Sequence, residues 1–427
     1  MATPKLKLGN DIWATKQKSL LAYNDEGGNF KSLPFQVDRI SGGTYVGRNG
    51  LIQSAASNEP RVDFLNNTKG GLLLEPSRTN LQIRSEEFEN SAWSKTRITV
   101  SDNNVISPTG ELSASKLAEN TSGTNAYFID DLYGATGGTY TFSCFLKKGT
   151  LRYAGIRALT NNFGNRHFVL VDLENGNVTS TNTSGSGVTW EYNVDSYGNG
   201  WYRLSVTGSH TSSNVGLLIS GSNEPTPSYG GVIPSYNADG NGNFYAWGAQ
   251  LEAGDYSTSY IPTAGSAATR VQDYIENRYT GLSSASGTIF IDLDTKGLDS
   301  NYSKIIALRD TVTGDSIRFE PFQSGSAFIL GIFGLNGANV LPPFPNEATL
   351  PINNRTKIAF TFSGSSFKFI QDGGGVITGT YTGTPRQYNQ IGGANITGGT
   401  MHNGIIQDFR IYDEVLTDAE LKTLTTL

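Results

Sequence analysis

Short runs of β-branched and aromatic residues, separated by turns rich in Gly and Asn, recur along residues 81–270 and 287–427. Turns such as Gly137-Gly138 and Gly198-Asn199-Gly200 are typical of connections between antiparallel strands. Gly is abundant, at 51 residues, and only 16% of the chain is charged, so the residues that build long helices are scarce. The pattern predicts an all-β fold: two tandem antiparallel β-sandwiches (jelly rolls), preceded by an extended N-terminal anchor and a small β connector.

Local patterning divides the chain into five expected segments. Residues 1–32 are polar and cannot form their own core, so we expect an extended anchor that lies on a partner. Residues 33–80 are expected to form a small β connector or collar. Residues 81–270 are the first sandwich, residues 271–286 a linker, and residues 287–427 the second sandwich.

Two stretches predict local structure in detail. Residues 243–251 alternate as a buried strand, after which a turn follows and Pro262 prevents a further ladder. Near the C-terminus, Thr417 and Glu420 have the spacing of a capping box, which predicts a short closing helix.

Charge and apolar content exclude several classes of protein. The net charge is −6 and Lys and Arg are not clustered, so we expect no nucleic-acid partner. No apolar run reaches the roughly 18 residues of a membrane span, and no signal peptide is visible, so no membrane insertion is expected. The single cysteine, Cys144, lies at an apolar-phase position of a strand and is predicted to be a core residue.

The sequence offers no catalytic constellation. None of the three histidines has a second one at metal-ligand spacing, and His167 is interpreted as a structural strand residue. Glu252 and Asp255 are possible carboxylates for sugar hydrolysis, but their position favours hydrogen bonding within a turn. We therefore expect no enzyme activity, no catalytic residue and no cofactor.

Aromatic residues are the candidates for carbohydrate binding, because sugars stack on flat exposed rings. Trp190 and Tyr192 share one face of a predicted strand. Tyr229 and Tyr236 lie in a Pro/Ser/Gly/Asn-rich loop, where burial is difficult to arrange.

The loop that follows is a weak candidate for calcium. Oxygen-bearing side chains alternate with Gly at Asp239, Asn241 and Asn243, but the full twelve-residue calcium loop is missing. A plain turn is the alternative, and no other metal site is predicted.

Four groups of residues form a recognisable combination. They are Gly50-Leu51-Ile52 with Pro60-Arg61-Val62-Asp63 and residues 72–81; residues 85–88 with Trp93-Ser94-Lys95; residues 200–207; and residues 247–263 with Thr269-Arg270. Together they resemble the fibre and spike proteins of tailed bacteriophages, on heads or tails. The resemblance covers roughly residues 33–273 and implies that the first sandwich is similar to carbohydrate-binding jelly rolls.

A fifth group, residues 404–421, resembles the last strand and closing helix of laminin-G-like, concanavalin-A-like sandwiches. It implies a lectin-type fold for residues 287–427 without naming a sugar, because fold and function separate.

These resemblances imply a virion protein, made in the host cytoplasm, that is structural and adhesive. Expected partners are a capsid or tail protein bound through residues 1–32, and glycans of the host surface or environment. The protein is expected to be a homotrimer, since fibre proteins of this kind commonly are and closed cyclic symmetry fits. A polysaccharide depolymerase and a cellular surface lectin are the alternatives.

Overall fold

The computed structural model describes residues 2–16, 19–22, 33–134, 136–160, 164–210, 214–277, 286–297, 305–311, 316–324, 327–334, 354–380, 390–392 and 403–427. Strands dominate these residues, and the one helix among them is α2 (Asp418–Thr425), so the prediction of an all-β fold is confirmed. No helix in the described part of the chain has the length and apolarity to cross a membrane.

The chain forms two compact units. The first unit consists of Met1–Arg48, Ser54–Ser77 and Val271–Leu427. The second unit consists of Asn49–Gln53 and Arg78–Arg270.

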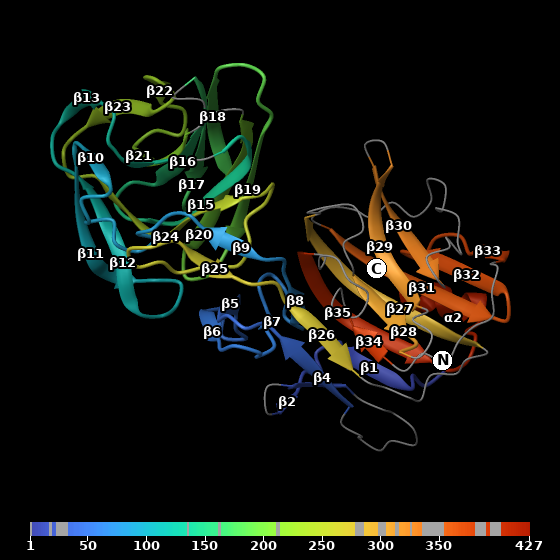
Figure 1. Ribbon diagram of the computed structural model, residues 1–427. Helices are drawn as coiled ribbons and strands as arrows, with labels where there is room; N and C mark the ends of the chain where they lie inside the picture. Colours follow the sequence, from blue (N-terminus) through green and yellow to red (C-terminus); the bar gives the residue numbers. More distant parts are fainter. Residues whose placement is uncertain are drawn as a thin grey trace. The chain divides into compact units, whose positions relative to one another are not determined.

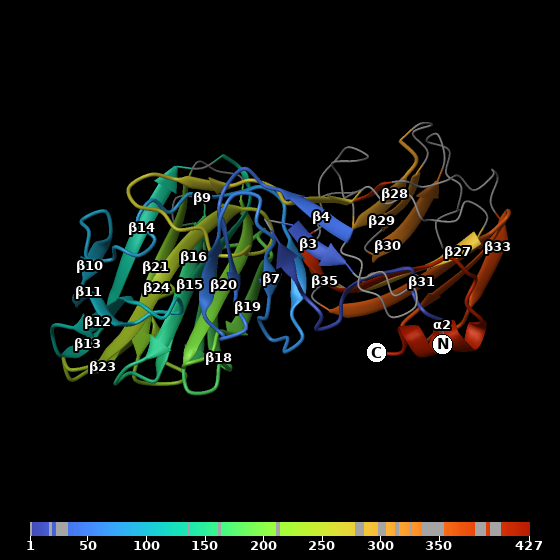
Figure 2. The ribbon, with the colours of Figure 1, turned by 90° about the horizontal axis from the view of Figure 1, so that it is seen from below.

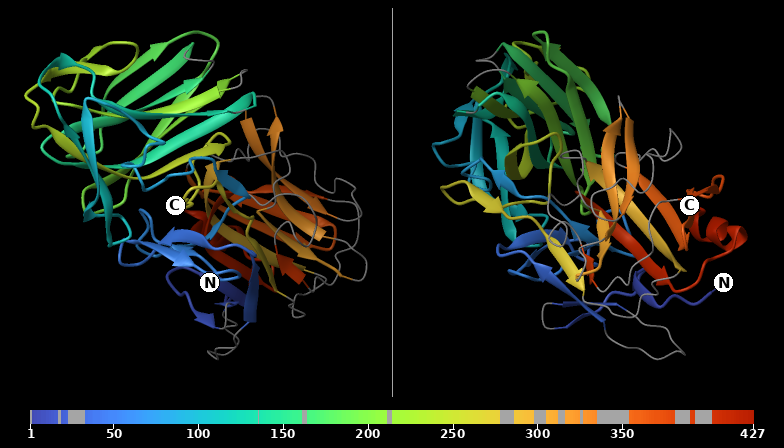
Figure 3. Two further views of the ribbon diagram at one scale, coloured as in Figure 1. Left: turned by 60° about the vertical axis from the view of Figure 1, so that its left-hand side comes forward. Right: turned by 45° about the vertical axis from the view of Figure 1, so that its right-hand side comes forward.

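The second unit is built on two six-stranded sheets whose strand pairs are antiparallel. Sheet I has the order β11 (Ile98–Ile106), β12 (Leu112–Glu119), β24 (Asn243–Ala253), β15 (Gly138–Lys148), β20 (Trp201–His210), β19 (Trp190–Ser196). Sheet II has the order β10 (Ser94–Thr96), β14 (Phe128–Gly134), β21 (Asn214–Ser222), β16 (Tyr153–Thr160), β17 (Asn165–Asp172), β18 (Val178–Ser184). Smaller ladders join β13 (Gly123–Asn125), β23 (Pro234–Ala238) and β22 (Ser228–Tyr229), and pair β9 (Arg78–Asn80) with β25 (Ala268–Arg270). Figures 1 and 3 show the strands of this unit in layers.

Alternating side chains of the two sheets fill the core between them. On β15, Phe142, Cys144 and Leu146 point into this core. Cys144 is fully buried, as predicted, and its burial raises the pKa of the thiol. It is therefore a packing residue held as a neutral thiol.

The first unit contains two sheets, and each of them combines strands from the early part and the late part of the chain. Sheet III has the order β33 (Ile377–Thr380), β32 (Ser366–Gln371), β31 (Arg355–Ser363), β27 (Ser286–Gly297), β35 (Asn403–Tyr412), β8 (Gly71–Leu74), β7 (Val62–Asp63), and β1 (Leu6–Gly9) also pairs with β35. Sheet IV has the order β2 (Thr15–Lys16), β3 (Ser19–Ala22), β4 (Leu33–Asp38), β26 (Tyr274–Asn277), β34 (Gln390–Gly392), β28 (Ile306–Arg309), β29 (Ser316–Ser324), β30 (Ala327–Gly334). The remaining described strands are β5 (Gly43–Val46) and β6 (Ile52–Ala55).

Strand β35 shows why this unit needs the N-terminal part of the chain. One edge of β35 pairs with β27, while the other edge pairs with β8 along Gly404–Ile406 and with β1 along residues 408–411. Leu6 and Leu8 of β1 are buried in the same core as Ile289 and Phe409. The early strands thus cover a sheet edge that would otherwise expose unpaired backbone groups.

The expected segment boundaries therefore change. Residues 1–32 include strands β1 to β3 rather than a wholly extended anchor, and most of residues 33–80 belongs to the first unit. The expected linker at 271–286 contains β26, which pairs with both β4 and β34. Local patterning misses this organisation because the partners of these strands lie hundreds of positions away, and it is these partners that supply the core.

The closing helix forms as predicted. The Thr417 side chain accepts a hydrogen bond from the Glu420 amide, and the Glu420 carboxylate accepts one from the Thr417 amide. Leu421 and Leu424 pack with Phe290 and Ile370 on the face of sheet III opposite the main core. Figure 2 shows α2 beside this sheet.

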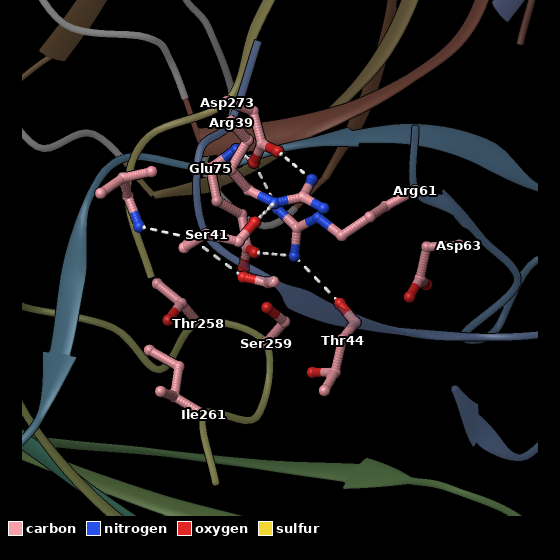
Figure 4. A network of polar contacts seen from close by, with 12 residues as sticks. Arg39, Ser41, Thr44, Arg61, Asp63, Glu75, Thr258, Ser259, Ile261 and Asp273 are labelled. Atoms are coloured by element: carbon pink, nitrogen blue, oxygen red, sulfur yellow. Dashed lines mark hydrogen bonds and ion pairs between the residues drawn. The ribbon is translucent and has the colours of Figure 1, made fainter. Parts of the chain in front are cut away.

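A buried ion cluster ties three segments of the first unit together (Figure 4). Arg61 donates to Glu75 at 2.6 Å and also to Asp273, while Arg39 donates to Asp273 at 2.8 Å. Two further bonds join Glu75 and Asp273: the Glu75 amide donates to the Asp273 carboxylate, and the Asp273 amide donates to the Glu75 carbonyl. Strands β4, β7, β8 and β26 are thereby held at their ends by one network.

The cluster can be buried because its two arginines are matched by two carboxylates. Burial opposes the charge on Arg61, but the carboxylates of Asp273 and Glu75 outweigh it and raise the pKa of Arg61. Removing one member of such a buried pair leaves its partner charged and unpaired, which is far more costly than losing a surface pair.

We expect Asp273→Asn to destabilise the protein by about 3–5 kcal/mol, because both Arg39 and Arg61 lose their shared carboxylate. Urea unfolding followed by intrinsic fluorescence measures the change. The matched control is Asp11→Asn, which breaks the exposed pair with Arg48 and should cost at most about 1 kcal/mol. Equal effects of the two substitutions would contradict a structural role for the cluster.

Candidate functional site

The stretch from Trp247 to Thr263 is built for packing. Trp247 on β24 is buried, and its ring contacts those of Phe145 and Tyr260 at centroid distances of 5.3 and 4.4 Å. Gly248 has φ +62° beside a register irregularity between β24 and β15, and a Cβ there would lie 3.0 Å from the Phe145 ring. The Trp-Gly pair therefore lets the strand bulge while the indole stays in the interior.

Polar side chains from β9 and β24 hold residues 258–261 of the same stretch in place. The Asn80 side chain accepts from the Leu251 amide at 3.0 Å and donates to the Ile261 carbonyl at 2.8 Å. The Gln250 side chain accepts from the Ile261 amide at 2.7 Å. Glu252, which is fully buried, accepts from the amide and hydroxyl of Thr258. The predicted hydrogen-bonding role of Glu252 is thus confirmed, although the residue lies in strand β24 and not in a turn, and its carboxylate is closed to a substrate.

Arg203, from the predicted segment 200–207, completes this internal brace. It donates to the Thr258 carbonyl at 2.6 Å and to the Ser143 hydroxyl at 3.0 Å. Burial works against its charge, but Tyr197 and Glu252 outweigh that effect and raise the pKa of Arg203. The buried polar residues of this signature therefore serve the fold, and a binding surface has to be sought elsewhere.

Three aromatic side chains gather where β19, at the edge of sheet I, faces β17 of sheet II. Trp190 and Tyr192 lie on one face of β19, as their alternation predicts. The His167 ring of β17 is stacked against both, at centroid distances of 5.6 and 6.4 Å. We call His167, Trp190 and Tyr192 the aromatic edge.

Neighbouring residues fix the aromatic edge. The Trp190 indole lies over Gly208, where a Cβ would come within 2.3 Å of the ring. His167 Nδ1 is 2.7 Å from the Thr183 hydroxyl, while Nε2 is buried without a partner among the described residues. Tyr192 is 48% exposed, so it presents its ring to solvent. A flat, partly exposed group of rings beside hydroxyl groups suits the apolar face of a sugar ring.

His167 is the member of this group that sequence reasoning missed. The residues around His167 have the pattern of a strand, but the rings that His167 contacts belong to a strand of the other sheet. Nothing in the local sequence around His167 reports that contact.

The two loop tyrosines do not join the aromatic edge. Tyr236 is 2% exposed, packs in the core of the second unit and donates to Glu119 at 2.7 Å, so its prediction as a stacking platform is wrong. The physical reason is that β23 inserts it between the sheets beside Tyr127. Tyr229 is half-buried near Phe168, and its hydroxyl donates to Ser180 at 2.9 Å.

The loop at 239–243 is organised by a carboxylate rather than around an ion. Glu119 accepts from the amides of Gly240 and Gly242 at 3.2 and 3.0 Å. Asp239 accepts from the Asn241 amide, and Asn243 is buried and donates to Thr150. These bonds are those of a turn. Within the described ranges, no three His, Cys, Asp or Glu side chains are placed to hold a metal ion.

The first unit has an apolar pocket between its sheets. It is lined by Leu74, Leu293, Ile305 and residues 404–406. The lining side chains are all Leu or Ile, and Gly404 has no side chain. The pocket therefore offers no polar side chain that would orient a sugar.

Comparison with known proteins identifies one domain. Residues 271–422 match the family described as the concanavalin A-like lectin/glucanases superfamily. A search of curated proteins finds no match.

Several solved structures show weak likeness. Domain 4 of AbnA, a GH43 extracellular arabinanase from Geobacillus stearothermophilus, in complex with arabinotriose, is 16% identical, with a TM-score of 0.31 over 40% of this chain and 83% of that one. The CBM40 of the Ruminococcus gnavus IT-sialidase, bound to alpha2,3 sialyllactose, is 15% identical, with a TM-score of 0.26 over 34% and 84%. Mouse laminin alpha1 domains LG4-5 are 11% identical, with a TM-score of 0.21 over 68% and 86%. Scores this low carry no argument, so the assignment rests on the family match: residues 271–422 carry a concanavalin A-like lectin/glucanase domain.

Proposed function

We propose that this protein is a structural and adhesive fibre or spike of a tailed-phage particle, which binds glycans of the host surface or environment. The observation that carries the adhesive part is the aromatic edge, where a solvent-exposed Tyr192 extends a stack formed with Trp190 and His167. The structural part is supported by the sequence resemblance over residues 33–273.

Binding without hydrolysis is supported by what the signature carboxylates do. Glu75 and Asp273 are buried in the ion cluster, and Glu252 is buried in the brace around Thr258. A glycosidase needs two carboxyl groups that reach the sugar from opposite sides. These three are held by internal contacts, which supports binding without hydrolysis.

Attachment and assembly complete the proposal. The protein would join a capsid or tail protein through residues 1–32, and three copies would form the fibre. Since β1 is part of sheet III, the attached surface would include a folded strand and not only extended chain.

We expect Tyr192→Ala to weaken glycan binding by about 1 kcal/mol, or roughly fivefold, because the exposed ring of the stack is lost. A glycan array identifies a bound sugar, and calorimetry then compares the variants. Tyr245→Ala is the matched control, since Tyr245 is half-buried on β24 and follows the core residue Phe244, so it faces away from the core. Unchanged affinity of folded Tyr192→Ala, or an equal loss in the control, would contradict this site.

His167 links the aromatic edge to pH. Its burial, which is 7% relative exposure, lowers the pKa of the imidazole below the ordinary value of 6.5. The folded state therefore favours neutral His167, and the unfolded state takes up a proton first as the pH falls. The stability that comes from neutral His167 is present above pH 6.5 and is lost as the pH falls through the folded-state pKa.

We expect His167→Asn to reduce the loss of thermal stability between pH 8 and pH 5. Asparagine keeps a polar atom near Thr183 but does not titrate. Thermal unfolding of both proteins at the two pH values measures the difference, in which the titration of other groups cancels. Identical pH dependence of the two proteins would contradict a buried neutral imidazole.

The expected assembly is a trimer. Light scattering of folded protein should give the mass of three chains of 45.9 kDa each. A single-chain mass at micromolar concentration would count against the fibre.

A further inference from the structure

The outer face of sheet II carries a second group of side chains that the aromatic edge does not use. Phe168, Leu170 and Leu218 form a small cluster on the face opposite the main core, and Val232 packs on them. Segment 229–233, which we call the strap, thus covers part of this face.

A buried arginine lies in this apolar setting. Arg157 on β16 is directly opposite Phe168 on β17 and Leu218 on β21, and Leu218 is in turn opposite Asp130 on β14. Arg157 is only 4% exposed, yet its Nε has no hydrogen-bond partner among the described residues. Burying a cationic donor without a partner is costly, so the site is incomplete as it stands.

The carbonyl oxygen of Gly231 accepts hydrogen bonds from two arginines. Arg157 Nη1 donates to the Gly231 carbonyl at 3.3 Å, and Arg166 Nη1 donates to the same oxygen at 3.1 Å. Burial first, and then the charge of Arg166, lower the pKa of Arg157 to about 10, against the attraction of Asp130. Arg157 therefore remains charged at neutral pH, and the charge of Arg166 acts on it from nearby.

The strap that supplies this carbonyl is held under strain. Val232 has φ +63°, a conformation that β-branched residues rarely adopt, and it is 5% exposed. The Tyr229 hydroxyl ties the strap to Ser180 on β18, while the Gly230 amide donates to the Ile233 carbonyl within the strap.

We propose that Arg157 and Arg166 bind the carboxylate of an acidic sugar at the strap, in place of the Gly231 carbonyl. A planar carboxylate matches the guanidinium edge that includes Arg157 Nε, and its second oxygen can accept from Arg166. The negative charge also removes the repulsion between the two arginines. This inference rests on the proposed function, in that it names the class of glycan, but it uses a different face from the aromatic edge.

The test uses the full chain and a panel of uronate and sialylated oligosaccharides, each paired with its neutral methyl ester. Calorimetry should show at least one acid bound about tenfold more tightly than its ester. Arg157→Lys, which keeps the charge but not the planar edge, should abolish that preference, and Arg166→Gln should reduce it. Lys116→Gln is the control, since Lys116 pairs with Tyr245 on sheet I and should leave the preference unchanged.

Two results would overturn the inference. The first is that no acid on the panel exceeds its ester with folded wild-type protein. The second is that Arg157→Lys and Arg166→Gln, both folded by circular dichroism, keep the full preference. Tyr192→Ala separates the two proposals, because it weakens stacking at the aromatic edge but should leave the ratio of acid to ester unchanged. Absence of an acid preference in the wild type, with binding that still depends on Tyr192, rejects only the acidic site. An acid preference together with overall affinity that Tyr192→Ala leaves unchanged rejects only the aromatic edge.

Discussion

The guanidinium of Arg61, held between Glu75 and Asp273, is the interaction on which the first unit depends. Arg61 and Glu75 come from one segment of this unit and Asp273 from a second, and Arg39 adds a third. Replacing a buried ion pair by apolar residues is often neutral, so its value need not be net stability. What it supplies is register: a charge buried here is tolerated only when all the segments are in place.

In the second unit too, buried polar side chains hold distant segments in place, here through neutral and charged hydrogen bonds. Asn80, Gln250 and Glu252 satisfy backbone groups of the chain that turns away from β24, and Arg203 ties that chain to β15. These four polar side chains, which belong to residue groups singled out in the sequence, are therefore internal. Surfaces suited to ligands lie apart from them, at the aromatic edge and at the strap. This separation lets a common scaffold carry different binding faces.

Local rules predicted what local physics controls. The alternation of β15 placed Cys144 inside, the capping box at Thr417 and Glu420 formed, and Trp190 and Tyr192 share a face because side chains alternate along any strand. Tyr236 shows where such rules fail. Its loop composition indicated exposure, but a ladder with β13 and a bond to Glu119 draw it into the core. Likewise, the sequence identifies His167 only as a strand residue, and its stacking on Trp190 and Tyr192 of the other sheet is visible only in the structure.

The sequence by itself determined the strand-rich fold and the closing helix, because period and turn chemistry act over a few residues. Its resemblance over residues 404–421 implied a lectin-type sandwich at the C-terminal end. Only the tertiary structure decided that β1 and β8 complete that sandwich, since the open edge of β35 accepts any compatible strand and the sequence does not say which. It also decided which polar residues are free to bind. Arg157 and Glu252 are both charged residues on strands, but one is left with an unpaired donor and the other is fully satisfied. That difference depends on neighbours from distant segments, which only packing brings together.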